Sequence, residues 1–242
     1  MFNDDITKDD IINCIDKKYT INKNEIAYDN KSCICLKFKR NSDFNYYYKP
    51  YAESLAKIVI LQQIVNLKEK DKVLCYLQEL HFSIINIDKK PKMDLYNLSK
   101  NNICKWLEIQ NPFEGMSNEE IYNHIALNVY GPILWQYLHN VSFLCKTYDQ
   151  QITLYGILNN LQYLMFCGMC VNNYIKKEIL PNFIVPHLCK GDVVGCIYLI
   201  HNVVNIALNK PIFTIKDFEN KYKCNMLNSL KVVFDKVYKF KD

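Results

Sequence analysis

The chain has 242 residues, half of them hydrophobic, and its 30 Lys and Arg residues against 25 Asp and Glu residues give a net charge of +5. This length is sufficient to bury a core, in one large domain or in two smaller ones. The positive excess is small and dispersed, whereas nucleic-acid-binding proteins gather basic residues on one face, so the composition argues against a nucleic acid partner.

The first hundred residues are predicted to be mainly helical. Apolar residues recur at helical spacing within 4–16, 51–68 and 72–85, and a shorter helix is expected within 98–110. Residues 32–39 alternate instead, with large apolar residues at every second position, which predicts a strand.

A break in the pattern at 111–120 marks the expected boundary between two regions. Ser117 and Glu120 have the spacing of a capping box, which predicts that a helix begins there. We therefore expect an N-terminal, mainly helical region over 1–110 and a second region over 111–242 that carries the chemistry.

The second region is predicted to be helical throughout. Helices are expected over 133–146, 150–166, 167–179, 192–208 and 216–236. Asp192 is suited to cap the fourth of these helices, and Pro211 is suited to end it. Together with the first region, this pattern predicts an all-α protein.

Residues 150–175 carry no charge, which raises the question of a membrane span. The stretch contains seven Gln and Asn side chains, and each amide would need a hydrogen-bond partner in lipid. This favours a buried helix pair over a membrane span. The polar, acidic start of the chain lacks the regions of a signal peptide, so an intracellular protein is expected.

The eleven cysteines are scattered along the chain, unlike those of a small secreted scaffold. Only Cys33/Cys35 and Cys167/Cys170 are close pairs. A zinc site would need a second close pair at metal spacing, and His187 with Cys189 is the one other candidate, so a bound metal is disfavoured. An intracellular, reducing setting with one catalytic pair fits the pattern better.

Cys167 and Cys170 are expected at the beginning of a helix. The unpaired N–H groups and positive dipole at that end would lower a thiol pKa and stabilise a thiolate, as in a redox disulfide. Phe166 and Met169 make the surroundings apolar, so two cysteines buried in the core are an equally good interpretation of this motif alone.

Two further groups of residues are predicted to lie on helix faces. Trp135 and His139 are four residues apart and share a face, where they could line a flat aromatic ligand or simply pack in the interior. His201, Asn202 and Asn205 form a polar arc on an otherwise apolar helix. Buried amides need partners, which favours a bound heterocycle over contacts between helices.

The three motifs resemble, in this order, the Erv/ALR-type FAD-linked sulfhydryl oxidases. They are Trp135-Gln-Tyr-Leu-His139, Cys167-Gly-Met-Cys170, and a long block from His201-Asn202 to Lys210-Pro211-Ile-Phe213. The resemblance covers about residues 128–224. The additional N-terminal region and the Cys-Gly-Met-Cys variant are most similar to the baculovirus-type oxidases of large insect DNA viruses.

The resemblance implies a four- or five-helix bundle that binds FAD and oxidises protein thiols with molecular oxygen, giving hydrogen peroxide. Cys170 would lie next to the flavin as the charge-transfer thiolate, and Cys167 would be attacked by the substrate thiol. The expected cofactor-binding residues are Gly131, Trp135, His139, His201, Asn202, Val204, Asn205, Lys210 and Tyr222. A homodimer in the host cytoplasm, nucleus or virion is also implied.

The chain departs from the family pattern at several positions. Tyr198 replaces a cysteine, Asn209 replaces a glycine, and Met165-Phe166 replaces Tyr-Pro before the first cysteine of the pair. A Cys189–Cys196 disulfide remains open, as does a shuttle role for Cys33/Cys35. Alternatives are an inactive helical scaffold derived from such an oxidase, and a thioredoxin-like reductase, which would need a βαβ pattern before the dithiol.

Overall fold

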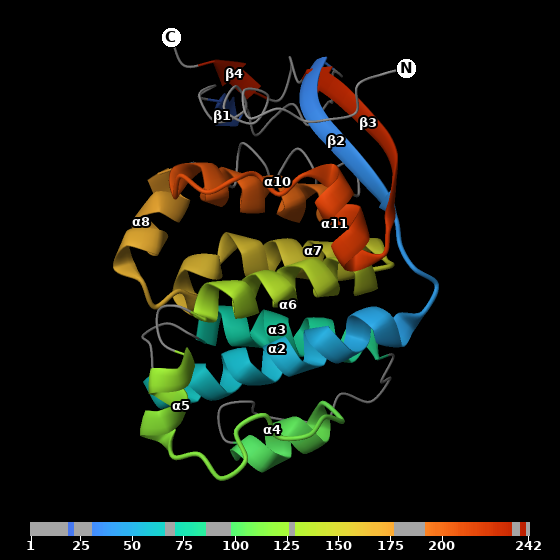
Figure 1. The fold of residues 1–242 in the computed structure, drawn as a ribbon. Helices are drawn as coiled ribbons and strands as arrows, with labels where there is room; N and C mark the ends of the chain where they lie inside the picture. The colour runs from blue at the N-terminus through green and yellow to red at the C-terminus, as the bar shows by residue number, and fades with distance from the viewer. Residues whose placement is uncertain are drawn as a thin grey trace. The chain divides into compact units, whose positions relative to one another are not determined.

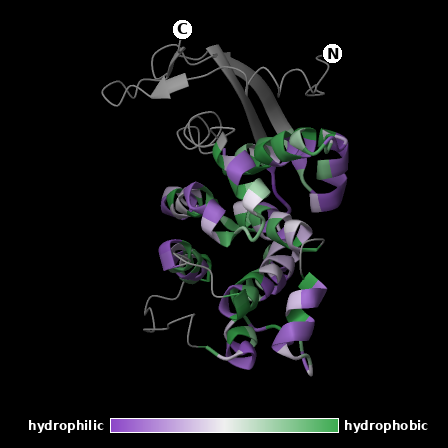
Figure 2. Cartoon of the chain, turned by 90° about the vertical axis from the view of Figure 1, so that its left-hand side faces the viewer, coloured by the Kyte–Doolittle hydropathy of each residue, from purple (hydrophilic) through white to green (hydrophobic). Residues whose placement is uncertain are grey.

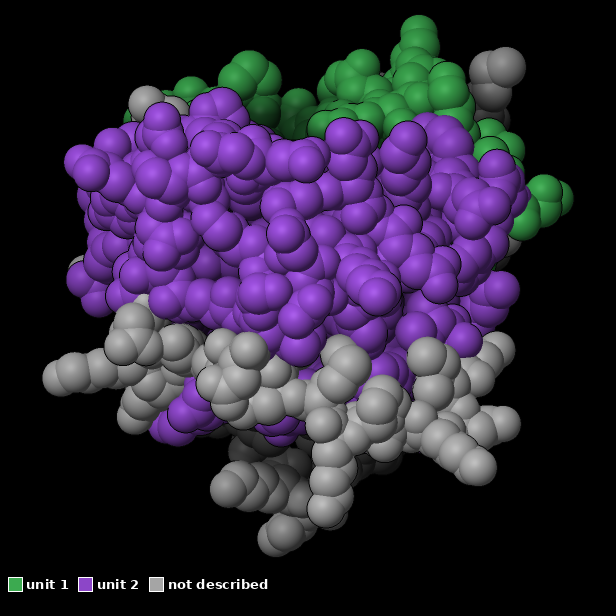
Figure 3. Space-filling view, turned by 90° about the horizontal axis from the view of Figure 1, so that it is seen from below, with its two compact units in different colours: residues 1–42, 173–242 green, residues 43–172 purple. Residues whose placement is uncertain are grey.

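The computed structural model describes residues 19–21, 31–65, 71–85, 98–125, 129–176, 192–233 and 238–240. The chain forms two compact units, residues 1–42 with 173–242 (unit 1) and residues 43–172 (unit 2), which Figure 3 colours separately. The expected boundary near residue 110 falls inside unit 2. The described residues are mostly helical, in agreement with the predicted all-α class, and two small sheets accompany the helices.

Unit 2 is built from helices alone in its described part (Figure 1). Its elements are α2 (Phe44–Val65), α3 (Asp71–Ile84), α4 (Lys100–Trp106), α5 (Asn118–Ile125), α6 (Tyr130–Leu144), α7 (Tyr148–Asn159), the 3-10 helix η1 (Leu161–Leu164) and the first turn of α8 (Gly168–Lys176). Helix α2 packs along α6, and α3 packs along α7. Apolar faces turn toward one another and polar faces turn outward (Figure 2).

The core of unit 2 explains why α2 begins before the predicted position. The sequence predicts a helix from residue 51, after Pro50, yet the helix begins at Phe44 and includes that proline. Tyr47 and Tyr51, four residues apart, are both buried on one face of α2. Tyr47 stacks on Phe143 of α6, with ring centroids 4.6 Å apart, and this packing offsets the cost of an interior proline.

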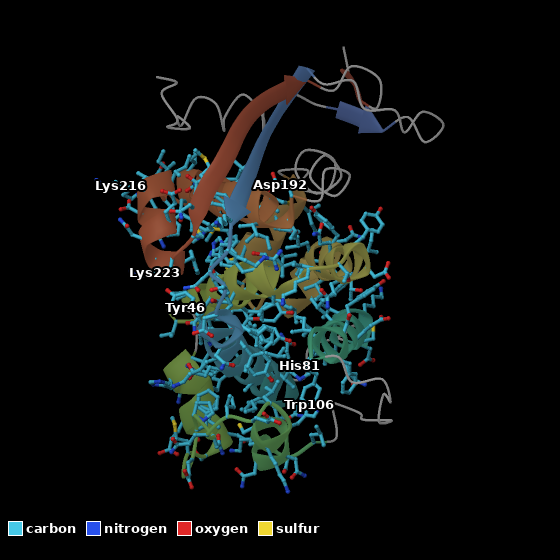
Figure 4. The ribbon with its side chains drawn as sticks, turned by 90° about the vertical axis from the view of Figure 1, so that its right-hand side faces the viewer. Tyr46, His81, Trp106, Asp192, Lys216 and Lys223 are labelled. Carbon is cyan, nitrogen blue, oxygen red and sulfur yellow. The ribbon has the colours of Figure 1, made fainter. Side chains whose placement is uncertain are left out.

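The helix caps predicted from the sequence are confirmed. The main-chain N–H of Glu120 donates to the Ser117 hydroxyl at 3.2 Å, and the Glu120 carboxylate accepts the N–H of Ser117 at 2.7 Å. The Asp192 carboxylate likewise accepts the N–H of Gly195 at 3.1 Å, at the beginning of helix α10 (Val193–Ala207; Figure 4).

The charge-free stretch over 150–175 is divided among several elements. The predicted single helix over 150–166 ends at Asn159, and η1 follows it. Asn160 bonds back to the carbonyl of Gly156 through both its main chain and its side chain, which closes α7 at that point. Within the described part of the chain, no helix is long and apolar enough to cross a membrane.

Unit 1 combines helices with two antiparallel pairs of strands. β2 (Lys31–Lys39) pairs with β3 (Asn225–Val233), and β1 (Tyr19–Ile21) pairs with β4 (Tyr238–Phe240). The helices are α10 (Val193–Ala207) and α11 (Ile215–Tyr222), and α10 packs against β2. The strand predicted over 32–39 is therefore confirmed.

The helix predicted over 216–236 is wrong beyond Tyr222. Lys223 adopts a left-handed conformation, with φ of 48°, and ends α11. The residues that follow form β3, because β2 offers them a partner strand for main-chain hydrogen bonds. The helix predicted over 4–16 lies outside the described residues.

Candidate functional site

The Cys167/Cys170 pair lies at the beginning of α8. The carbonyl of Cys167 accepts the N–H of Val171 at 3.0 Å, and its thiol sulfur accepts the N–H of Cys170 at 3.3 Å. Cys167 thus takes the position of a helix N-cap. Cys170 is exposed and Cys167 is half-buried, so the alternative of two cysteines buried in the core is wrong.

The two thiols of the pair have different acidities. Hydrogen bonds from the Cys170 thiol, and then from main-chain N–H groups, hold the pKa of Cys167 below its usual value. Partial desolvation, followed by the neighbouring Cys167, raises the pKa of Cys170 to about 11, although the residue is exposed. Cys167 is therefore the more acidic thiol of the reduced pair. The flavin-side role expected for Cys170 stays a prediction.

The segment before the dithiol is fixed by two side chains that the sequence analysis missed. The carbonyl of Leu164, three residues before Cys167, accepts the hydroxyl of Tyr130 at 2.6 Å and the side-chain amide of Gln62 at 3.2 Å. The donors come from α6 and α2. The helical periodicity places these residues on buried faces but does not indicate the carbonyl that they reach.

Trp135 and His139 lie together on α6, as their spacing predicts. Their ring centroids are 6.0 Å apart and their planes meet at 32°. His139 is fully buried and Trp135 is half-buried. Gly131, one turn before Trp135, has open space where a side chain would be. Trp135 thus gives this face of α6 a partly accessible aromatic surface, and the imidazole of His139 lies beside it in the interior.

In unit 1, Asn202 has a role that the sequence does not indicate. Its side chain is fully buried, and its amide accepts the main-chain N–H of Phe213 at 2.6 Å and donates to the carbonyl of Phe213 at 3.1 Å. The expectation that this amide needs a bound heterocycle is wrong, because the chain itself satisfies both of its polar atoms. His201, Val204 and Asn205 on the same helix are half-buried.

Two departures from the family pattern have structural explanations in the segment that leads to Phe213. The hydroxyl of Tyr198, which replaces the family's cysteine, donates to the carbonyl of Phe213 at 2.7 Å. Asn209, which replaces a glycine, has φ of 53°, a left-handed conformation that asparagine tolerates better than most residues. The N–H of Lys210 then bonds the carbonyl of Asn205 at 2.8 Å.

Cationic and aromatic side chains gather around Phe213. The ammonium group of Lys221 lies 5.6 Å from the ring centroids of both Phe213 and Tyr222, and the ring of His201 lies 5.9 Å from that of Phe213. Burial, followed by the charges of Lys221 and Lys210, lowers the pKa of His201 to about 4. Phe213 ends the third sequence motif, whereas Lys221 is not indicated by any sequence pattern.

Each unit, taken by itself, offers a group of side chains whose chemistry can be compared with that of a flavin dinucleotide. In unit 2, Trp135 and His139 supply an aromatic face and a hydrogen-bonding ring. In unit 1, Lys221 supplies positive charge beside the rings of Phe213 and Tyr222, and Lys210 adds a second charge that acts on His201, which suits an anionic ligand with flat rings. Considered separately, the group in unit 2 has side chains of the kind that bind a flavin ring, and the group in unit 1 has side chains of the kind that bind a diphosphate.

The other cysteines that the sequence singles out lie in β2, in α10 or outside the described residues. Cys33 and Cys35 lie two residues apart in the extended strand β2, where Cα atoms at that spacing are about 6.6 Å apart, near the upper limit for a disulfide. Cys196 is buried, and Cys189 and His187 lie outside the described residues. Among the residues described, no group of three or more His, Cys, Asp or Glu could hold a metal ion.

Comparison of the chain with models of known families, with curated proteins and with solved structures finds no match. A functional assignment therefore depends on the dithiol and on the two groups of residues described above.

Proposed function

We propose that this protein is an FAD-dependent thiol oxidase that forms disulfide bonds in protein substrates. The observation that carries the proposal is the accessible Cys167/Cys170 pair at the beginning of α8, in which the first sulfur accepts a main-chain N–H. Such a pair can alternate between dithiol and disulfide without rebuilding the helix. The resemblance to Erv/ALR-type oxidases implies that FAD is the cofactor and that electrons pass from the substrate thiols through this pair to FAD.

The chemistry of the pair follows thiol–disulfide exchange. A substrate thiolate attacks the sulfur of Cys167 in the Cys167–Cys170 disulfide, and Cys170 leaves as a thiolate. The second substrate thiol loses its proton and attacks the mixed disulfide, which releases the substrate disulfide and returns Cys167 as a thiolate. Two electrons have then moved from the substrate to the pair, and the Cys170 N–H stabilises the charge on the sulfur of Cys167.

FAD, when bound, accepts two electrons from a dithiol and passes them to oxygen, giving hydrogen peroxide. Trp135 and His139 would hold its flat ring system by stacking and hydrogen bonding. The resemblance also implies contacts of Lys210 and Tyr222 with FAD, and within unit 1 Lys221 lies beside Tyr222 and adds a positive charge suited to a diphosphate. Asn202 would act indirectly, because it fixes the main chain at Phe213 rather than offering a free amide.

The further parts of the proposal come from the resemblance. The enzyme would be a viral protein that works as a homodimer on protein thiols in the host cytoplasm, the nucleus or the virion. A thioredoxin-like reductase is disfavoured, because α7 and η1 precede the dithiol in the described chain where that fold requires a strand. An inactive helical scaffold derived from such an oxidase is the competing hypothesis.

The test is a visible absorption spectrum of the purified protein, followed by oxygen uptake with a reduced, unfolded protein as substrate. We expect flavin bands, release of FAD on denaturation, and turnover that is lost in Cys170→Ala. The matched control is Cys75→Ala, which removes an exposed thiol from α3 and should retain turnover. A colourless protein that neither takes up FAD nor consumes oxygen would overturn the proposal and favour the scaffold.

A further inference from the structure

The carbonyl of Leu164 is a fixed point between the helices of unit 2 and the dithiol. Its two donors, Tyr130 of α6 and Gln62 of α2, are both buried, with exposed fractions of 8% and 0%. Two hydrogen bonds to one carbonyl in the interior restrain it strongly, because loss of either donor leaves a buried acceptor less well satisfied.

The restraint continues from Leu164 toward Cys167. The ring of Tyr130 also packs edge-on against the ring of Phe166, with centroids 4.5 Å apart. Tyr130 thus contacts the chain on both sides of Met165, and Phe166 directly precedes Cys167. A shift of this segment would move the Cys167 sulfur relative to the N–H of Cys170, which it accepts at 3.3 Å.

We propose that Tyr130 and Gln62 are positioning residues that set the geometry and thiolate stability of the Cys167/Cys170 pair. Through Gln62, helix α2 supports the redox centre, which gives a role to the region before residue 110 that the sequence leaves without one. The proposal deepens the proposed function, since it concerns the same pair. Burial raises the pKa of Tyr130, so its hydroxyl stays a neutral donor while the thiols titrate.

The test measures the thiolate of Cys167 directly, by the pH dependence of its alkylation with iodoacetamide, read by peptide mass spectrometry. Tyr130→Phe removes the hydroxyl donor and keeps the ring against Phe166. Gln62→Met removes the amide donor at similar volume. Weakening the N–H bond to the sulfur should make alkylation of Cys167 at neutral pH about three- to tenfold slower, the size expected for one hydrogen bond.

The matched control is Tyr163→Phe, in the same η1 segment. The Tyr163 hydroxyl accepts a hydrogen bond from the exposed ammonium of Lys72 at 3.5 Å and does not bond the carbonyl of Leu164, so its removal should leave the alkylation profile unchanged. Circular dichroism identifies folded variants, and Gln62→Met provides the same test where Tyr130→Phe does not fold. Wild-type profiles in the folded variants would overturn the proposal. Because alkylation requires neither FAD nor turnover, failure of the oxidase assignment would be seen separately.

Discussion

In the interior of unit 2, the hydroxyl of Tyr51 lies 3.0 Å from Nδ1 of His81, and this hydrogen bond joins α2 to α3. The ring of His81 also lies 4.3 Å from that of Trp106 in α4 (Figure 4). His81 is fully buried, and its Nε2 has no hydrogen-bond partner among the described residues. A titratable side chain therefore occupies the contact between three helices.

We predict that unit 2 loses stability in mild acid because of His81. Burial lowers its pKa from 6.5 to about 4 in the folded state, so the unfolded chain binds the proton first. The contribution of neutral His81 to the free energy of unfolding is fully present above pH 6.5. It is lost as the pH falls toward 4, by about 1.4 kcal/mol per pH unit. Urea denaturation at several pH values across this range measures the slope of the free energy of unfolding against pH.

The double variant His81→Leu with Tyr51→Phe removes both partners of the bond, so that no buried polar group is left alone. This double variant should reduce the slope of the free energy of unfolding against pH by the contribution of one proton. Tyr48→Phe, which lies beside the same histidine but leaves it in place, is the control and should keep the wild-type slope. An unchanged slope in the double variant would show that His81 is not the responsible group.

Asn202→Ala is predicted to destabilise the protein by about 1–3 kcal/mol, the cost of leaving buried main-chain groups unsatisfied. The N–H of Phe213 would lose its acceptor and the carbonyl would keep only the bond from Tyr198. Asn205→Ala on the same helix leaves the bonds to Phe213 intact and is the control. Chemical denaturation measures the free energy of unfolding of both variants. Equal values would contradict a stabilising role for the hydrogen bonds from Asn202 to Phe213.

Lys221→Gln is predicted to raise the pKa of His201. Burial is the largest cause of its lowered value and persists in the variant, but the loss of a neighbouring positive charge favours the protonated imidazole. Lys223→Gln, two residues along the chain, removes an exposed charge that is not among those acting on His201. NMR titration of the histidine ring protons measures the pKa, and identical values in the two variants would refute the arrangement around Phe213.

The parts of the fold that could be predicted are those that depend on local sequence. Ser117 with Glu120 and Asp192 mark helix starts because caps bond N–H groups within three residues. β3 could not be predicted, because its apolar spacing suits a helix as well and its partner β2 lies far away in the chain. At the site, the spacing brings Trp135 beside His139, whereas the main-chain atoms bonded by Tyr130 and Asn202 follow only from the folded backbone.

The last prediction concerns which thiol of the pair is the thiolate. At neutral pH, iodoacetamide should modify Cys167 ahead of Cys170, because the pKa of Cys167 is lowered while that of Cys170 is raised to about 11. The largest cause for Cys167 is the hydrogen bond from the Cys170 thiol. Cys170→Ala removes that donor and should raise the pKa of Cys167.

Cys170→Ser keeps a hydroxyl donor at the same position and should hold the pKa of Cys167 closer to its wild-type value than Cys170→Ala does. Peptide mapping after alkylation reads each cysteine separately, so the exposed Cys75 does not interfere. Prior modification of Cys170 would reverse the assignment, and equal pKa values of Cys167 in the Ala and Ser variants would contradict the role of the hydrogen bond from Cys170. The outcome bears on catalysis, because the thiolate that Cys167 holds after each exchange is the nucleophile that must close the disulfide again.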